Sequence, residues 1–200
     1  MSNLTHISNP FKDIFLIENF LSTDEIKFLN DFCKSANEDM WNLRYLKDRR
    51  KEALLKNSED SDDFKNEINN RNIFWDDKIL EIPDNYNDIK VSIWNKINLF
   101  FWGKYKVPEV DTIQRQYSGS NLKVHHDNGY KKNLERAIVI YLNDDYSDGE
   151  LFFPDYDLEF RPKAGSMITF PGTEDYMHGV KDVGDGPTRY VISVFAYTKW

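Results

Sequence analysis

Two histidines and an aspartate stand side by side in VHHDNGYKKNL, residues 124–134, in a chain with four histidines in all. If this segment is extended, its side chains alternate between two faces, so His125 and Asp127 point the same way and His126 points away. A His-x-Asp pair of this kind can chelate one cation. A stable transition-metal site needs a third ligand, and we expect it to be His178, in DYMHGV just before the last predicted strand.

Two imidazoles and one carboxylate form the ligand set known as a facial triad. This set binds Fe(II) on one side and leaves about three coordination positions open for a co-substrate and dioxygen. A structural zinc site, in contrast, is closed by four protein ligands. His125, Asp127 and His178 are therefore the predicted metal ligands and the predicted catalytic centre.

Arg189 follows His178 after ten intervening residues and stands in the predicted strand TRYVISVFAY, among apolar neighbours. A guanidinium matches a carboxylate in two parallel hydrogen bonds, so Arg189 is expected to bind the far end of a dicarboxylate whose near end chelates the iron. The dicarboxylate that fits this description is 2-oxoglutarate. Tyr117 and Tyr141 are expected to complete the hydrogen bonds of that carboxylate, and the alternative for both is packing in a core.

Short β-rich runs separated by turn clusters such as DDYSDG, PKAG and DVGDGP dominate the chain after Pro108. Their close spacing favours an antiparallel sandwich or barrel over parallel βαβ units. The predicted strands are DTIQRQY, AIVIYLN, ELFF, DLEF, SMITF and RYVISVFAY.

The first half of the chain is expected to support this β-rich part. A strand is predicted over 14–17, and a helix begins at the Ser22 and Glu25 pair, whose spacing is that of a capping box. A second helix with a buried face is predicted over 88–105. Residues 43–72 alternate charge with few large apolar groups, so they predict a solvated helix, a loop or a mobile cover.

The order of these motifs resembles the 2-oxoglutarate- and Fe(II)-dependent oxygenases, in particular their prolyl 4-hydroxylase branch. The resemblance spans about residues 108–200 and rests on QY, HHD, YLND, DGELFFP, RPKAG, MHGV and TRY. It extends weakly to IENFLSTDEI, whereas 40–87 match no family pattern. Two departures are Asp148-Gly149 in place of the usual Gly-Gly, and Arg189 where collagen-type hydroxylases often have lysine.

The resemblance implies a mainly β fold with supporting α-helices, a double-stranded β-helix that is also called a jelly roll and is cupin-like. One domain is expected over 1–200, with 1–107 as helical N-terminal support and 108–200 as the double-stranded β-helix core. The implied iron ligands are His125, Asp127 and His178. Arg189, Tyr117 and Tyr141 are implied to bind the co-substrate.

The implied reaction is hydroxylation of a C–H bond, most directly in a prolyl residue of a peptide or protein. It is coupled to decarboxylation of 2-oxoglutarate to succinate, and the cofactors are Fe(II), 2-oxoglutarate, O2 and, as an accessory reductant, ascorbate. Other substrates stay open: a free amino acid, a small metabolite or a nucleobase. Alternatives from other classes are an inactive jelly-roll binding module and a zinc-holding structural domain.

Composition narrows the partners. The formal net charge is −8, from 26 Lys+Arg and 34 Asp+Glu, and no basic stripe predicts nucleic-acid binding. The nucleic-acid demethylating branch also usually carries a second arginine where this chain has Phe195. One cysteine, Cys33, allows no intrachain disulfide and predicts a reducing cytoplasm. Neither an apolar run near the ~20 residues of a membrane span nor a signal-peptide pattern is present, so we expect no membrane association.

Overall fold

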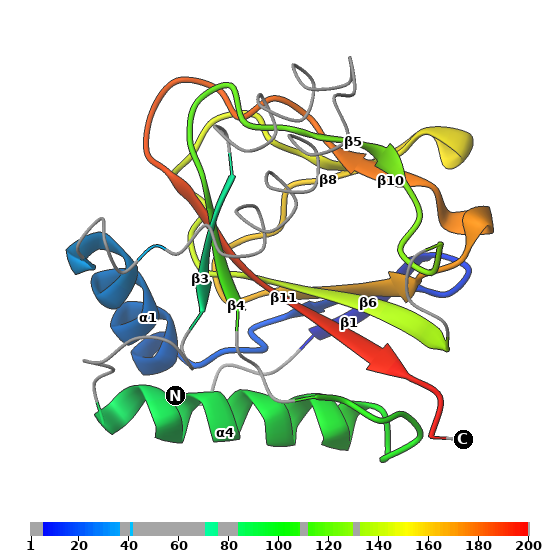
Figure 1. Ribbon diagram of the computed structural model, residues 1–200, viewed down its shortest axis with the longest axis horizontal. Helices are drawn as coiled ribbons and strands as arrows, with labels where there is room; N and C mark the ends of the chain where they lie inside the picture. Colours follow the sequence, from blue (N-terminus) through cyan, green and yellow to red (C-terminus); the bar gives the residue numbers. More distant parts are fainter. Residues whose placement is uncertain are drawn as a thin grey trace, which may run out of the picture.

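A computed structural model describes residues 6–36, 41, 71–75, 84–108, 112–129 and 133–199. Two antiparallel sheets face each other, and two helices cover the outer face of the larger sheet (Figure 1). The double-stranded β-helix predicted from the sequence is confirmed. Within the described part of the chain, no helix is both long enough and apolar enough to cross a bilayer.

The larger sheet has seven strands in the order β1-β2-β9-β6-β11-β4-β3, and all neighbours pair antiparallel. The three central strands are rich in β-branched and aromatic residues, which pack well on a pleated surface buried on both faces. The strands of this sheet are β1 (His6–Phe11), β2 (Ile14–Glu18), β9 (Met167–Pro171), β6 (Leu134–Tyr141), β11 (Arg189–Tyr197), β4 (Thr112–Gln116) and β3 (Arg71–Trp75).

The smaller sheet has four short strands in the order β5-β10-β7-β8. In its register His125 stands directly opposite His178, so the end of one strand and the start of another bring two histidines together. The strands are β5 (Leu122–His125), β10 (His178–Val180), β7 (Leu151–Phe153) and β8 (Leu158–Phe160).

Helix α1 (Thr23–Ser35) begins with the predicted capping box: the Ser22 hydroxyl accepts from the backbone N–H of Glu25, and the Glu25 carboxylate accepts from that of Ser22. Helix α4 (Asp84–Phe100) starts and ends earlier than the predicted 88–105. It ends because Trp102 and Gly103 take left-handed backbone conformations, with φ of 52° and 63°.

Two apolar cores lie on opposite faces of the larger sheet. The first joins that sheet to the helices through residues such as Leu29, Ile97 and Ile192 and includes Cys33, whose thiol pKa is raised by burial. The second lies between the two sheets and includes Tyr141, Phe170 and Val191. The residues that face the inside of the sandwich therefore come from both sheets.

Three strands of the larger sheet, β1, β2 and β3, precede residue 108. The first half of the chain thus contributes strands as well as the predicted helices, and the sheet crosses the predicted boundary between 107 and 108. That boundary stays a prediction. Apart from residues 41, 71–75 and 84–87, the segment 40–87, including the predicted cover, lies outside the described residues.

Candidate active site

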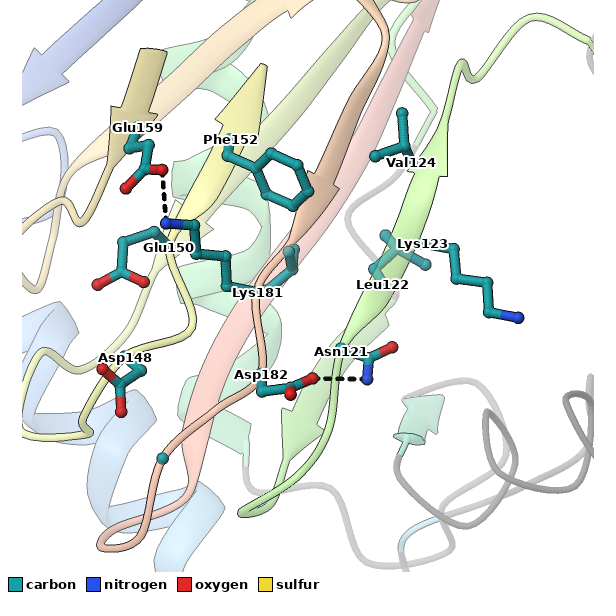
Figure 2. Close-up of a pocket in the computed structure, with 12 residues that line it drawn as sticks. Asn121, Leu122, Lys123, Val124, Asp148, Glu150, Phe152, Glu159, Lys181 and Asp182 are labelled. Carbon is teal, nitrogen blue, oxygen red and sulfur yellow. Dashed lines mark hydrogen bonds and ion pairs between the residues drawn. The ribbon is translucent and has the colours of Figure 1, made fainter. Parts of the chain in front are cut away.

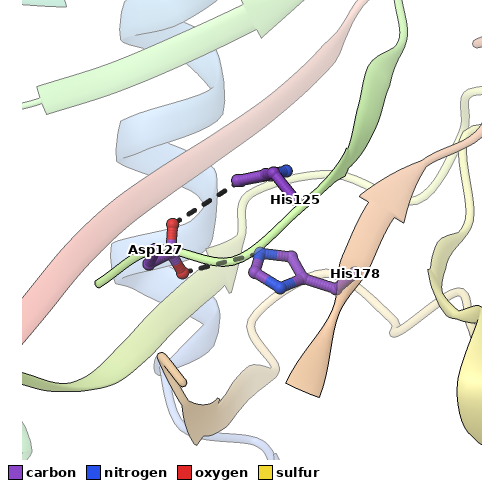
Figure 3. A group of neighbouring side chains, drawn as sticks. All are labelled: His125, Asp127 and His178. Atoms are coloured by element: carbon purple, nitrogen blue, oxygen red, sulfur yellow. Dashed lines mark ion pairs between the residues drawn. The ribbon is translucent and has the colours of Figure 1, made fainter. Parts of the chain in front are cut away.

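His125, Asp127 and His178, called the triad below, converge at one edge of the sandwich (Figure 3). Asp127 lies just beyond β5, where its backbone N–H and that of Asn128 donate to the carbonyl of Gly172 at 3.1 and 2.9 Å. A Cβ at Gly172 would lie 2.1 Å from a methyl carbon of Leu134, so a glycine is needed for this close approach.

The ligand atoms of the triad face one another. Nε2 of His125 lies 3.6 Å from Asp127 Oδ1, and Nε2 of His178 lies 3.5 Å from Oδ2. One potential ligand atom from each residue lies within 4.8 Å of the others. An ion with bonds of about 2.1 Å to nitrogen and oxygen can contact all three atoms after small side-chain movements.

Both histidines are oriented through their other ring nitrogen. Nδ1 of His125 contacts the carbonyl of Lys123 at 2.8 Å, and Nδ1 of His178 contacts that of Tyr176 at 3.0 Å. A carbonyl only accepts, so Nδ1 carries the hydrogen and Nε2 of the neutral ring presents a lone pair to Asp127. Burial lowers the pKa of His178 and so favours its neutral ring, although the Asp127 charge has the opposite effect.

Asp127 completes a set of three ligands whose facing atoms can each donate an electron pair to a metal. Its Oδ2 is buried and accepts no hydrogen bond from the described residues. An unsatisfied buried carboxylate oxygen is costly, and a cation at this point would stabilise it. Two imidazole nitrogens and one carboxylate suit Fe(II), so the residues present fit the metal that the sequence predicted.

An inner cavity of about 110 Å³ opens between the two sheets. Many of its walls are apolar. The triad lies near the start of strand β6, and Tyr141 and Arg189 lie near the end of that strand. The triad is placed near the start of β6 by Gly172, whose carbonyl accepts from Asp127 and whose N–H donates to the carbonyl of Glu135. The lining residues are Gln114, Gln116, Leu122, His125, Asp127, Ala137, Ile138, Val139, Tyr141, Leu151, Phe170, His178, Val180, Arg189, Val191, Ser193 and Phe195.

The far end of the inner cavity has the opposite chemical character. Arg189 is 2% exposed and its Nε–H has no acceptor among the described residues. The hydroxyl of Tyr141 is also buried without a partner of good geometry. Burial raises the pKa of Tyr141 to about 12, although the Arg189 charge opposes this, so the hydroxyl keeps its proton. Unpaired donors and a positive charge suit a carboxylate.

Tyr117 and His126, which were considered from the sequence, lie apart from this arrangement, and so does Arg136. Tyr117 does not line the inner cavity; its ring lies 5.2 Å from the Arg115 guanidinium. His126 Nδ1 contacts the side-chain oxygen of Asn128 at 2.8 Å. Arg136 is buried and donates to the Thr169 hydroxyl and to a backbone carbonyl of the N-terminal hairpin, so it supports the fold.

A larger depression, about 760 Å³, lies on the outer face of the smaller sheet (Figure 2). Three of its charged groups have partners at its surface: Lys181 pairs with Glu159 at 2.5 Å, and Asp182 accepts a hydrogen bond from Asn121 at 2.7 Å. Lys181 and Glu159 are both about half exposed, so these charges are solvated. The inner cavity, in contrast, contains buried groups that lack partners, and it is the candidate active site.

Comparison with known proteins agrees with this assignment. Residues 112–197 match the family model of the 2OG-Fe(II) oxygenase superfamily. The matched segment begins with β4 and ends with β11, so it includes the triad and Arg189. This segment is a 2OG-Fe(II) oxygenase domain. The prediction of a 2-oxoglutarate-dependent, non-haem Fe(II) dioxygenase is confirmed at this level.

Solved structures share the fold of this chain at low sequence identity. The viral collagen prolyl hydroxylase of Paramecium Bursaria Chlorella virus-1, in complex with 2OG, is 18% identical with a TM-score of 0.63, covering 94% of this chain and 97% of its own. A Pseudomonas putida prolyl-4-hydroxylase is 18% identical with a TM-score of 0.59, covering 94% of each chain. A Trichoplax adhaerens prolyl hydroxylase, in complex with a hypoxia inducible factor peptide fragment, is 14% identical with a TM-score of 0.56, covering 94% and 84%.

A search of curated proteins gave no match to this chain. At identities of 14% to 18%, the solved structures establish the fold, while individual residue roles must come from the site itself. The structure brings five of the six predicted site residues to the inner cavity: His125, Asp127, His178, Arg189 and Tyr141.

Sequence reasoning missed Gln114 and Gln116, which line the inner cavity of the oxygenase from strand β4. The signal that could have identified them is the alternation of side chains along the strand TIQRQY. Ile113 and Tyr190, the register partner of Arg115, belong to the core beneath the helices, so Gln114 and Gln116 face the other way. Tyr117 shares the parity of Arg115, which accounts for its absence from the inner cavity.

Proposed function

We propose that this oxygenase hydroxylates a prolyl residue of a peptide or protein and converts 2-oxoglutarate to succinate and carbon dioxide. The observation that carries the proposal is that one buried cavity has metal-binding atoms at one end and hydrogen-bond donors with a positive charge at the other. The triad end presents lone pairs, one of them on the buried Asp127 Oδ2, and the Arg189 end presents Nε–H and the Tyr141 hydroxyl, which have no acceptor among the described residues. A metal ion and a dicarboxylate together satisfy both ends.

In this proposal the triad holds Fe(II) through Nε2 of His125, Nε2 of His178 and the carboxylate of Asp127. Bound there, Fe(II) supplies the activation of dioxygen that drives oxidative decarboxylation and C–H hydroxylation. The carbonyls of Lys123 and Tyr176 fix the orientation of the two rings through Nδ1, so that Nε2 of each ring faces the ion. Ascorbate is proposed only as an accessory reductant, and a turnover assay with and without it tests this.

Arg189 and Tyr141 are proposed to bind the distal carboxylate of 2-oxoglutarate. Arg189 supplies the charge, and the protonated Tyr141 hydroxyl supplies one further donor. Apolar walls that include Leu151, Phe170 and Val180 exclude water and strengthen these hydrogen bonds. The co-substrate would therefore be fixed at its far end while its 2-oxo acid group faces the triad.

The prolyl substrate is supported by the three solved structures above, which are prolyl hydroxylases and match this chain over 94% of its length. One of them is in complex with a peptide fragment, which supports a peptide or protein substrate here. The single cysteine, Cys33, is buried and fits the proposed reducing cytoplasm.

The test combines two readouts on one reaction. Protein reconstituted with Fe(II) is incubated with 2-oxoglutarate, O2 and a library of proline-containing peptides, and matched peptides with alanine in place of proline serve as controls. We expect succinate together with peptides that gain one oxygen atom at proline. Succinate formed only with small metabolites, or equal oxidation of the alanine peptides, would contradict the prolyl assignment. Absence of succinate with every substrate would contradict the oxygenase activity.

A further inference from the structure

Gln116 lies directly opposite Arg189 in the register between β4 and β11, and both side chains line the inner cavity. The two residues are 1% and 2% exposed. Nη1 of Arg189 donates a hydrogen bond to Oε1 of Gln116. Because only the amide oxygen can accept, this contact fixes both the orientation of the amide and one side of the guanidinium.

The contact leaves a defined edge of the guanidinium for a ligand. Nη1 is used by Gln116, whereas Nε is buried and has no acceptor among the described residues. Nε and Nη2 donate in parallel from the opposite edge, which is one of the two geometries that bind a carboxylate in a fork. Gln116 thus holds Nη1, the nitrogen that does not belong to the Nε–Nη2 edge.

The remaining neighbours of the guanidinium restrain it less specifically. Its central carbon lies 5.2 Å from the ring centroid of Tyr141 and 5.6 Å from that of Tyr146. Such ring contacts attract the cation, but they do not fix its rotation in its own plane. In the described part of the chain, no carboxylate pairs with Arg189, so its contact with a neutral amide leaves the full positive charge available.

We propose that Gln116 is a positioning residue for the co-substrate. It turns the Nε–Nη2 edge of Arg189 toward the distal carboxylate and, being neutral, preserves the charge that selects a dicarboxylate over a monocarboxylate. This inference rests on the proposed binding of 2-oxoglutarate at Arg189. It adds a residue that acts through the guanidinium rather than through the metal.

Gln116→Glu separates this role from a merely structural one. A glutamate keeps the length of the side chain and forms an ion pair with Arg189, so the fold should be preserved. The same ion pair neutralises the guanidinium and repels the dicarboxylate. We expect a Kd for 2-oxoglutarate raised at least about tenfold, with no decrease of the melting temperature of the ligand-free protein.

Binding is measured by calorimetry on the anaerobic Fe(II) protein, so no turnover is needed. The second ligand is 2-oxopentanoate, which has the same 2-oxo acid group and chain length but lacks the distal carboxylate. Gln116→Glu should change its Kd by less than about twofold, because its distal end carries no charge for Arg189 to recognise. The preference of the wild type for 2-oxoglutarate should therefore largely disappear.

Gln114→Glu is the matched control, since Gln114 lines the same cavity from the same strand, whereas the hydrogen bond of Arg189 goes to Gln116. It measures the general repulsion from one added carboxylate, and Gln116→Glu must exceed it several-fold. Gln116→Met, neutral and of similar length, should raise the KM for 2-oxoglutarate while kcat stays near the wild-type value.

Each outcome has a definite meaning. If Arg189→Ala weakens 2-oxoglutarate binding but Gln116→Glu and Gln116→Met do not, the inference about Gln116 is wrong and the proposed function stands. If Gln116→Glu weakens both oxo acids equally, or no more than Gln114→Glu does, the positioning role is also overturned. If Arg189→Ala itself leaves 2-oxoglutarate binding unchanged, the proposed function fails first.

Discussion

The triad end and the Arg189 end of the inner cavity differ in how the protein builds them. The triad lies at the ends of short strands and in a loop, held by backbone carbonyls of Lys123, Tyr176 and Gly172. Arg189 stands on a long strand of the larger sheet, and its partner Gln116 stands on the neighbouring strand. One end therefore depends on loop geometry, and the other on the register of a sheet.

The two ends also differ in what they lack. The triad offers lone pairs, while the Arg189 end offers hydrogens, and each end has buried polar atoms with no partner among the described residues. Buried polar groups that stay unsatisfied destabilise a fold, so Asp127, Tyr141 and Arg189, which line one cavity and each have such an atom, indicate ligands rather than packing. A change at one end should affect the metal, and a change at the other should affect the co-substrate.

The largest effect is expected for Asp127→Ala. The substitution removes one ligand and the only negative charge of the triad, so Fe(II) should be lost on desalting. Metal content after anaerobic reconstitution measures this directly. His126→Gln is the control: this neighbour contacts Asn128 and is not one of the three grouped ligands, so iron should be retained. Stoichiometric iron in Asp127→Ala would show that the triad is not the metal site.

Arg189→Ala should leave iron bound but weaken 2-oxoglutarate. The lost charge-assisted hydrogen bonds are worth about 1.5 to 3 kcal/mol, or roughly 10- to 150-fold in affinity. The KM for 2-oxoglutarate and the iron content are measured on the same sample. Equal loss of iron in this variant would mean that Arg189 holds the fold together and would remove the distinction between the two ends.

Gly172→Ala should disturb the triad end through the backbone contact between Gly172 and Asp127. The new methyl group would lie 2.1 Å from a Leu134 methyl carbon, and the resulting shift moves the carbonyl that holds Asp127. Overpacking of this kind typically costs about 1 to 3 kcal/mol of unfolding free energy. Urea unfolding of the metal-free protein and an Fe(II) titration test this. An unchanged iron affinity would separate Gly172 from the positioning of Asp127.

The smallest effect at the site is expected for Glu25→Gln, remote from both ends. Burial raises the pKa of Glu25, but hydrogen bonds from Lys96, Ser22 and Ser92 outweigh it, so the net shift is downward. A lowered carboxyl pKa stabilises the fold above the unfolded-state value of about 4.3, and this stability is lost as the pH falls through the folded-state pKa.

Glu25→Gln should therefore lower the unfolding free energy by about 1 kcal/mol at pH 7, a modest value because the pair is partly solvated. The difference from wild type should shrink toward pH 3. Urea unfolding at several pH values measures it. Iron and 2-oxoglutarate affinities should stay unchanged, and a loss of either would show that α1 and α4 control the site more directly than their positions indicate.

Much of this arrangement could be predicted because the residue types that can bind the metal and the co-substrate are few or conspicuous in the sequence. Four histidines left few choices for a metal site, and Arg189 stood out as a charge in an apolar strand. The capping box at Ser22 and the short β-rich runs predicted their elements for local reasons. Each of these signals lies within one segment of the chain.

The contacts that sequence could not predict depend on strand pairing. Tyr117 was chosen for its hydroxyl, but the parity of β4 turns Gln116 to the inner cavity instead. Parity within a strand can be read only when one face is known, and the partner of Gln116 is set by register with β11. The strand β3 likewise depends on pairing with β4, which lies nearly forty residues further along the chain.

The most direct test of the central claim is the affinity for 2-oxoglutarate measured with and without Fe(II) under anaerobic conditions. If one dicarboxylate bridges the triad and Arg189, Fe(II) should tighten 2-oxoglutarate binding, and 2-oxoglutarate should tighten Fe(II) binding by the same factor. In Arg189→Ala both ligands should still be coupled, but at lower 2-oxoglutarate affinity. A 2-oxoglutarate affinity that does not depend on Fe(II) would contradict the account.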